Sequence, residues 1–81
     1  MPGPYSAREV IKVLTNHGFR RISSTGGSHE KFVYTHPDTG EKRVVTVPLH
    51  DELAPGTLDS IAKQAGANDV RAFRDWLDDS L

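Results

Sequence analysis

The apolar residues of this chain change their spacing twice along the sequence, and that change limits the folds open to it. Over residues 7–14 they recur at i, i+3, i+4 and i+7, which is typical of one buried face of a helix. Over residues 19–47, β-branched and aromatic residues gather in short runs bounded by glycine and proline, which indicates strands. A helical spacing returns over residues 58–65. This order predicts an α+β fold with both helices on one face of a three-stranded sheet and the other face free.

Local signals place the ends of these elements. Ser6 and Glu9 form the pattern of a capping box, and Tyr5 before them can pack on Val10 as a hydrophobic staple. Gly18 is suited to end the first helix. The expected strands are residues 19–23, 29–35 and 42–47, with turns at 24–27 and 36–40. The second helix is expected to start at Pro55 and to end at Gly66. A third helix starts at Asn68 or Asp69 and carries an apolar stripe of Val70, Phe73 and Leu77, with Trp76 at its flank.

Length and composition indicate a single domain, with residues 1–5 as a flexible lead-in and residues 67–81 as an appended helix. A chain of 81 residues has a small core and no room for a buried cofactor, so we expect none. It has no cysteine, which excludes disulfides, a thiolate nucleophile and cysteine-based zinc sites. The sequence shows neither an export signal nor an apolar run of about 20 residues. We therefore expect a cytoplasmic protein.

Charge is unevenly distributed in a chain whose net charge is -1. Residues 5–50 hold seven basic and four acidic side chains, whereas residues 67–81 hold four acidic and two basic ones. The basic part can meet phosphates although the whole chain is nearly neutral.

A glycine-rich turn at residues 26–29 presents one imidazole at the start of a strand. The two glycines at 26 and 27 suit a backbone with positive φ, and His29 then opens the second expected strand. If Phe32 and Tyr34 point to the core, a period of two puts His29 and Lys31 together on the outer face. A histidine on a rigid strand and open to solvent suits proton transfer; the alternative is a hairpin with an ordinary surface histidine.

Several short motifs occur together in this chain. They are Gly27-Ser28-His29, Val47-Pro48-Leu49-His50, Gly56-Thr57-Leu58 with Ile61, and Lys63-Gln64-Ala65-Gly66, after an opening helix over residues 6–18. In this combination the chain resembles the HicA family of toxin ribonucleases over about residues 6–66. The family resemblance implies a double-stranded-RNA-binding-like fold of order α-β-β-β-α. It further implies metal-independent cleavage of messenger RNA by a toxin of a toxin-antitoxin system, with a cognate HicB-like antitoxin as partner. The catalytic histidine of the family falls on His29, and the histidine after the Val-Pro pair falls on His50.

The residue types fit that chemistry. A ribonuclease without a metal can use the 2′-hydroxyl of the RNA as nucleophile, so the protein needs to supply only proton transfer and charge stabilisation. His29 can exchange protons near neutral pH, and His50 is a possible second proton-transfer group. Candidates to bind the phosphates are the turn at Gly27 and Ser28, which can form an anion nest, and the basic side chains of Lys31, Arg20, Arg21, Lys42 and Arg43.

Other interpretations remain open at this point. His50 can instead be a surface residue, His17 fits a helix C-terminus, and His36 lies in a proline turn that is expected to be exposed. A zinc site of His29, His36 and His50 would have ligand spacings unlike those of known motifs. A non-catalytic RNA-binding module of the same fold would need a basic cluster early in the second helix, which offers only Lys63. A pure protein-interaction domain is supported only by the acidic tail and its tryptophan.

Overall fold

The computed structural model describes residues 5–25, 27–67 and 69–81, with side-chain environments for all of them except residues 23–25. The expected lead-in at residues 1–4, and the predicted roles of Gly26 in the turn and Asn68 in the cap, lie outside the described residues. The elements in chain order are α1 (Ala7–Asn16), β1 (Arg20–Thr25), β2 (His29–Thr35), β3 (Lys42–Pro48), α2 (Pro55–Gln64) and α3 (Val70–Ser80). This is the predicted α-β-β-β-α order with a further C-terminal helix.

The three strands form one antiparallel sheet with β2 in the centre. The bounds of β2 are as predicted, and those of β3 differ only by including Pro48. The predicted bounds of β1 were wrong, because its pairing with β2 continues to Thr25, which lies opposite His29. The register shifts between Arg21 and Ser23, as a β-bulge does, and this irregularity explains the broken alternation of the sequence there.

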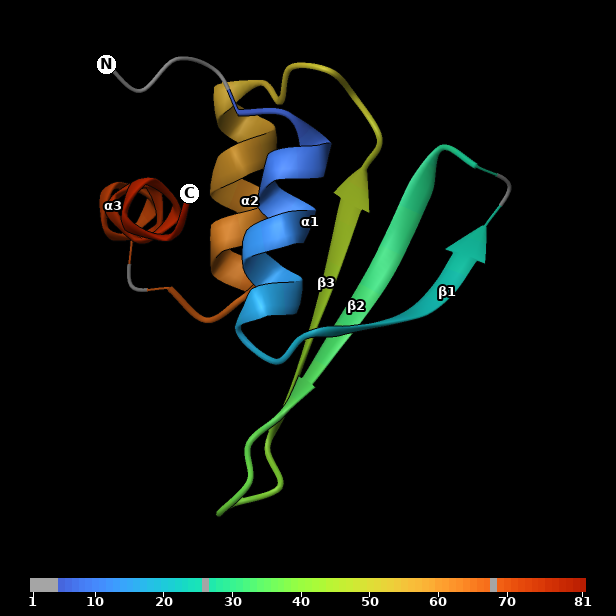
Figure 1. The fold of residues 1–81 in the computed structure, drawn as a ribbon, viewed down its shortest axis with the longest axis vertical. Helices are drawn as coiled ribbons and strands as arrows, with labels where there is room; N and C mark the ends of the chain where they lie inside the picture. The colour runs from blue at the N-terminus through green and yellow to red at the C-terminus, as the bar shows by residue number, and fades with distance from the viewer. Residues whose placement is uncertain (1–4, 26, 68) are drawn as a thin grey trace.

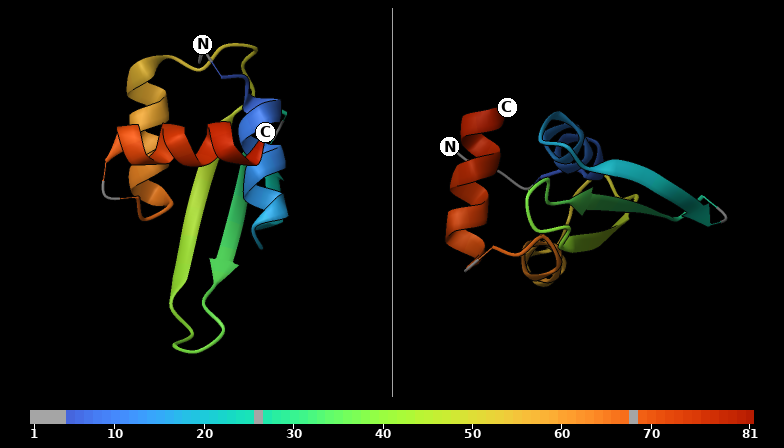
Figure 2. Two further views of the ribbon diagram at one scale, coloured as in Figure 1. Left: turned by 60° about the vertical axis from the view of Figure 1, so that its left-hand side comes forward. Right: turned by 90° about the horizontal axis from the view of Figure 1, so that it is seen from below.

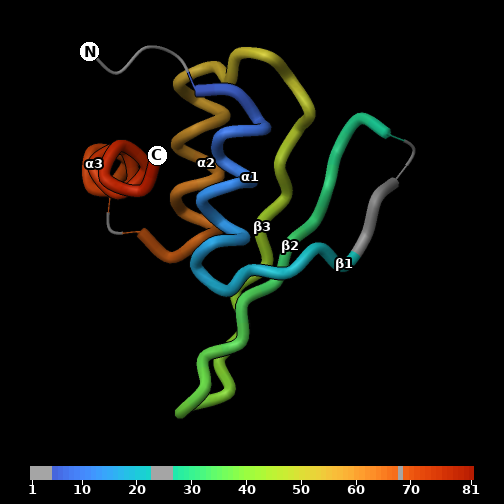
Figure 3. The backbone as a smooth tube through the Cα atoms, viewed as in Figure 1, coloured from blue at the N-terminus to red at the C-terminus, as the bar shows by residue number. Residues whose placement is uncertain are grey.

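The fold has three layers (Figures 1 and 2). Helices α1 and α2 lie side by side on one face of the sheet, as expected, and α3 crosses them on the side away from the sheet. Strand side chains with a period of two face these helices and are buried: Phe32, Val45 and Val47. The backbone trace in Figure 3 shows the β2–β3 hairpin extending past the ends of the helices. Among the residues that the structure describes, no helix lies over the opposite face of the sheet (Figure 2).

The start of α1 has the predicted geometry. The Ser6 hydroxyl accepts the Glu9 amide at 3.1 Å, and the Glu9 carboxylate accepts the Ser6 amide at 3.0 Å, which completes a capping box. Tyr5 and Val10, the expected staple pair, are both buried. Tyr5 is therefore packed in the core and does not belong to a flexible lead-in. Gly18 follows the helix with φ of 95°, a conformation that favours glycine.

Helix α3 is held by a cap, an apolar stripe and a polar contact. The Asp69 side chain accepts the Ala72 amide at 2.7 Å, and Phe73 and Leu77 are buried against the other helices. The Tyr5 hydroxyl donates a hydrogen bond to the Asp78 carboxylate. Burial, and then the hydrogen bond to Asp78 and its negative charge, raise the pKa of Tyr5 to about 12. The N-terminal turn of the domain is thus tied to its last helix.

Candidate functional site at the start of the central strand

The start of β2 and the end of β3 bring the two candidate histidines to the same end of the sheet. His29 lies opposite Pro48 in the β2–β3 ladder. Just outside the ladder, the amide of Leu49, the residue after Pro48, donates a hydrogen bond to the carbonyl of Ser28, the residue before His29, at 2.9 Å. The backbone carrying Ser28 and His29 therefore lies beside the backbone that leads to His50.

The His29 side chain is exposed, and its nearest polar partner is its own neighbour. Its Nδ1 atom lies 3.2 Å from the Ser28 hydroxyl oxygen. A hydroxyl group can either donate to Nδ1 or accept from it, so this contact suits both neutral tautomers of the imidazole. The Nε2 atom can then carry a proton or a lone pair, and the ring can act as an acid or as a base.

His50 lies in the loop after β3, and its backbone is fixed to the start of α1. Its carbonyl accepts the Ala7 amide at 3.0 Å, which satisfies one of the free amides of the first helical turn. Its exposed side chain lines a hollow of about 550 Å³, together with Arg8, Leu49 and Asp51. The hollow places a basic side chain of α1 next to the His50 loop. The sequence interpretation did not select Arg8, because no local signal relates the first turn of α1 to residues more than 40 positions away.

Some of the predicted phosphate-binding residues lie near His29. Gly27 and Ser28 are exposed, and Gly27 has φ of 86°, a turn conformation that favours glycine. Lys31 is exposed and follows His29 by two residues, so it lies on the same face of β2 at about 7 Å along the strand. His29 therefore has a glycine turn directly before it and one cation on its own face of β2.

The arginines of β1 lie further along the sheet. Arg21 binds Glu30 at 2.9 Å, so its guanidinium group already has an anionic partner. Arg20 is exposed and lies opposite Val33, four residues along β2 from His29. In the register of the sheet, the two arginines therefore lie opposite residues three and four positions along β2 from His29.

The basic residues at the start of β3 lie at the far end of the sheet. Lys42 is opposite Thr35, about 20 Å along β2 from His29, and Arg43 is opposite Tyr34, about 17 Å along β2 from His29. Arg43 also binds Glu41 at 3.4 Å. The structure therefore separates the predicted phosphate-binding residues into a group at His29 and a group at the opposite end.

His36 is also far from His29, because the two residues lie at opposite ends of β2. This separation rules out the zinc site of His29, His36 and His50 that the sequence left open. His36 was expected to be exposed in its turn; it is partly exposed, and its Nδ1 accepts the amides of Asp38 and Thr39 at 3.1 and 3.3 Å. Within residues 5–25, 27–67 and 69–81, no three histidine or acidic side chains are grouped so that they could hold a metal ion.

His17, expected at a helix C-terminus, is the C-cap residue of α1, and its ring contacts Trp76 on α3 at 4.7 Å between centroids.

The described part of the chain also contains no helix long and apolar enough to span a membrane.

The fold and the site define a small α+β protein that has a solvent-exposed histidine at the first position of its central strand. Comparison with known protein families agrees with this description and identifies the family. The family described as the HicA toxin of bacterial toxin-antitoxin systems matches residues 7–67, which is most of the chain, and the protein belongs to this family. Membership implies an antitoxin partner. No curated protein matches the chain in sequence.

Proposed function

We propose that this toxin is a metal-independent endoribonuclease that cleaves messenger RNA in the cytoplasm, and so arrests translation, with His29 as its catalytic residue. The observation that carries the proposal is the position of His29: an exposed imidazole on a central strand, 3.2 Å from the Ser28 hydroxyl and beside the backbone of the His50 loop. Membership of the HicA toxin family supports the same assignment, because the catalytic histidine of that family corresponds to His29 in the motif Gly27-Ser28-His29.

The reaction requires two proton transfers. The RNA 2′-hydroxyl loses its proton to a base and attacks the adjacent phosphorus, which forms a 2′,3′-cyclic phosphate. The bond from phosphorus to the 5′-oxygen of the next nucleotide breaks, and an acid gives that oxygen a proton. His29 supplies one of these groups, and His50 is the second proton-transfer group. A positioned acid or base contributes about 10² to 10⁴ in rate.

Substrate binding rests on the residues around the imidazole. The turn amides at Gly27 and Ser28 can donate hydrogen bonds to a phosphate oxygen, and Lys31 adds a positive charge on the same face. Arg20 and Lys42 neutralise phosphates further along the strand, and Arg43 contacts RNA at the same end of the sheet as Lys42. Arg21 contributes when RNA competes with Glu30 for its guanidinium group.

The test compares His29→Gln with Thr35→Ala. Glutamine preserves polarity and approximate size at position 29 but cannot exchange a proton near neutral pH. Thr35 is exposed on the same face of the same strand and serves as the matched control. We expect His29→Gln to lower cleavage of single-stranded messenger RNA by about 10² to 10⁴. Melting temperature and RNA affinity should stay close to those of the wild type, because exposed substitutions change stability by about 0.5 kcal/mol or less.

Two results would contradict the proposal. Full cleavage by His29→Gln would remove this histidine from the mechanism. A wild-type protein that binds RNA without cutting it would support the alternative, a non-catalytic RNA-binding module of the same fold. The structure gives little support to duplex binding through α2, since its Lys63 is already paired with Asp59 at 3.3 Å.

The antitoxin is proposed to be a HicB-like protein that covers the His29 face. Covering the imidazole and Lys31 would block both proton transfer and phosphate binding. Amide hydrogen exchange of β2 should then slow in the complex. Protection confined to residues 69–81 would instead identify α3 as the docking element.

A further inference from the structure

A second hollow, of about 290 Å³, lies at the opposite end of the domain from His29. It is formed where the ends of α1 and α2 meet the base of the β2–β3 hairpin and helix α3. Aromatic rings line it from several elements. His17 and Trp76 contact each other with centroids 4.7 Å apart, and Phe19 and Tyr34 with centroids 5.4 Å apart. Two pairs of aromatic rings, His17 with Trp76 and Phe19 with Tyr34, therefore line the same hollow.

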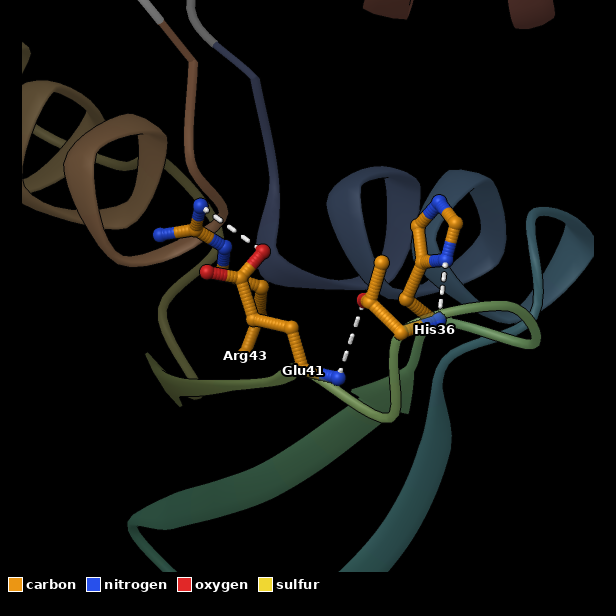
Figure 4. Close-up of polar contacts among 4 residues, drawn as sticks. His36, Glu41 and Arg43 are labelled. Carbon is orange, nitrogen blue, oxygen red and sulfur yellow. Dashed lines mark hydrogen bonds and ion pairs between the residues drawn. The ribbon is translucent and has the colours of Figure 1, made fainter.

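Polar groups stand at the rim of this hollow. Glu41 and Arg43 form an ion pair at 3.4 Å, and both side chains remain partly exposed, at 61% and 43%. Figure 4 shows this pair and the His36 ring projecting to the same side of the hairpin, towards the helices. Since His36 Nδ1 accepts two backbone amides, the neutral ring carries its hydrogen on Nε2, which is then a donor. The rim thus offers the Glu41 carboxylate as acceptor, and the Arg43 guanidinium group and His36 Nε2 as donors.

We propose that this hollow binds one unpaired nucleobase of RNA, with its faces against the aromatic rings and its edge at Glu41 and Arg43. Bases stack on tryptophan, tyrosine, phenylalanine and histidine rings, and this stacking contributes about 1–3 kcal/mol for each base. Guanine fits the rim best, because it has adjacent N–H donors for the carboxylate and the O6 and N7 acceptors for the guanidinium group. The choice of RNA as the source of the base depends on the proposed function.

The polar rim selects a nucleobase over an apolar side chain of a partner protein. A leucine or phenylalanine in the hollow would remove water from the Glu41–Arg43 ion pair and give no hydrogen bond to the donors and acceptors that this pair leaves unused, and this costs free energy. A base has donors and acceptors along one edge and an apolar face. The wall from α3 lies beyond residues 7–67, the part of the chain that matches the family, so the site depends on the appended helix.

The chain carries its own probe for this site, because Trp76 is its single tryptophan. We would titrate the intact protein with GMP, UMP and ribose 5-phosphate and follow Trp76 fluorescence, with N-acetyltryptophanamide correcting for absorption by the nucleotides. GMP should quench the fluorescence saturably, UMP should bind roughly tenfold more weakly, and ribose 5-phosphate should have no effect.

Glu41→Gln tests the contact to the base edge while leaving the probe in place. It should weaken GMP binding by about 5- to 100-fold, the range for a lost bidentate contact. Asp38→Asn makes the same charge change in the same exposed turn, outside the hollow, and should bind GMP as the wild type does. His29→Gln should also leave GMP binding unchanged, because position 29 lies about 20 Å away along β2.

The outcomes separate this inference from the proposed function. GMP binding by a protein that never cleaves RNA would support the nucleobase site and contradict only the nuclease assignment. No quenching by any nucleotide at millimolar concentration would overturn the site. Equal effects of GMP and ribose 5-phosphate, or equal losses in Glu41→Gln and Asp38→Asn, would also overturn it, because recognition would then not involve the base.

Discussion

The hydrogen bond from Tyr5 to Asp78 gives a sharp test of how α3 is attached. Replacing Tyr5 by phenylalanine removes the hydroxyl group and leaves the buried ring. The exposed Asp78 carboxylate returns to water, so no charge is left buried. A hydrogen bond to a charged group contributes about 1.5–3 kcal/mol, and we expect the lower end because Asp78 is exposed. For a domain of this size the melting temperature should fall by about 6–12 °C.

The stability difference should also depend on pH in a defined direction. The pKa of Tyr5 is raised from 10.0 to about 12 in the folded protein. The protonated hydroxyl is therefore favoured by folding, and its contribution is complete below the unfolded pKa. As the pH rises through the interval from 10.0 to about 12, the wild type loses roughly 2 to 3 kcal/mol, about half of it by about pH 11. The phenylalanine variant has no such loss.

Urea unfolding of both proteins at about pH 8 and about pH 11 measures this difference directly. The advantage of the wild type should be clear at the lower pH and nearly absent at the higher. Effects of lysine and arginine titration are common to both proteins and cancel. Tyr34→Phe, a change at a half-buried tyrosine of β2, is the matched control. A wild-type advantage that is the same at both pH values would refute the role assigned to the Tyr5 hydroxyl.

Three further predictions concern the core, the substrate and the chemistry. Leu77→Ala should destabilise the protein by about 2–5 kcal/mol, because this side chain of α3 is fully buried, whereas exposed Asp79→Ala should change stability by about 0.5 kcal/mol or less; equal unfolding midpoints in urea would contradict the packing of α3. Lys31→Ala should reduce the slope of RNA affinity against salt by about one, while Lys63→Ala should leave it unchanged; equal slopes would exclude a phosphate contact by Lys31. Excess chelator should leave RNA cleavage unchanged, and cleavage that is lost and then restored by zinc would contradict a metal-independent reaction.

The features of the fold that were predicted correctly depend on residues close to one another in the sequence. The capping box at Ser6 and Glu9 and the apolar stripes of the helices were confirmed, since each depends on residues within about one or two helical turns. The end of β1 was predicted incorrectly, because Ser24 and Thr25 look like turn residues and become strand only by pairing with Glu30 and His29. Cross-strand pairing overrides a weak local preference.

The same distinction applies to the candidate site. A period of two along β2 was enough to predict that His29 and Lys31 share a face, and that Phe32 lies on the buried one. That inference needed no knowledge of the rest of the chain. It did need the strand to have a single buried side, which three strands and two amphipathic helices provide.

By itself the sequence determined the order of the elements, the start of α1 and the face of the sheet on which His29 lies. Only the tertiary structure decided that the His50 loop is bonded to the first turn of α1, that Arg43 lies about 17 Å along the sheet from His29, and that Trp76 contacts His17. The physical reason is the range of the interactions. Helix periodicity and capping act over a few residues. The contacts of the His50 loop with α1 and of Trp76 with His17 join segments about 40 to 60 positions apart, and they form only when the sheet and the helix layers pack together.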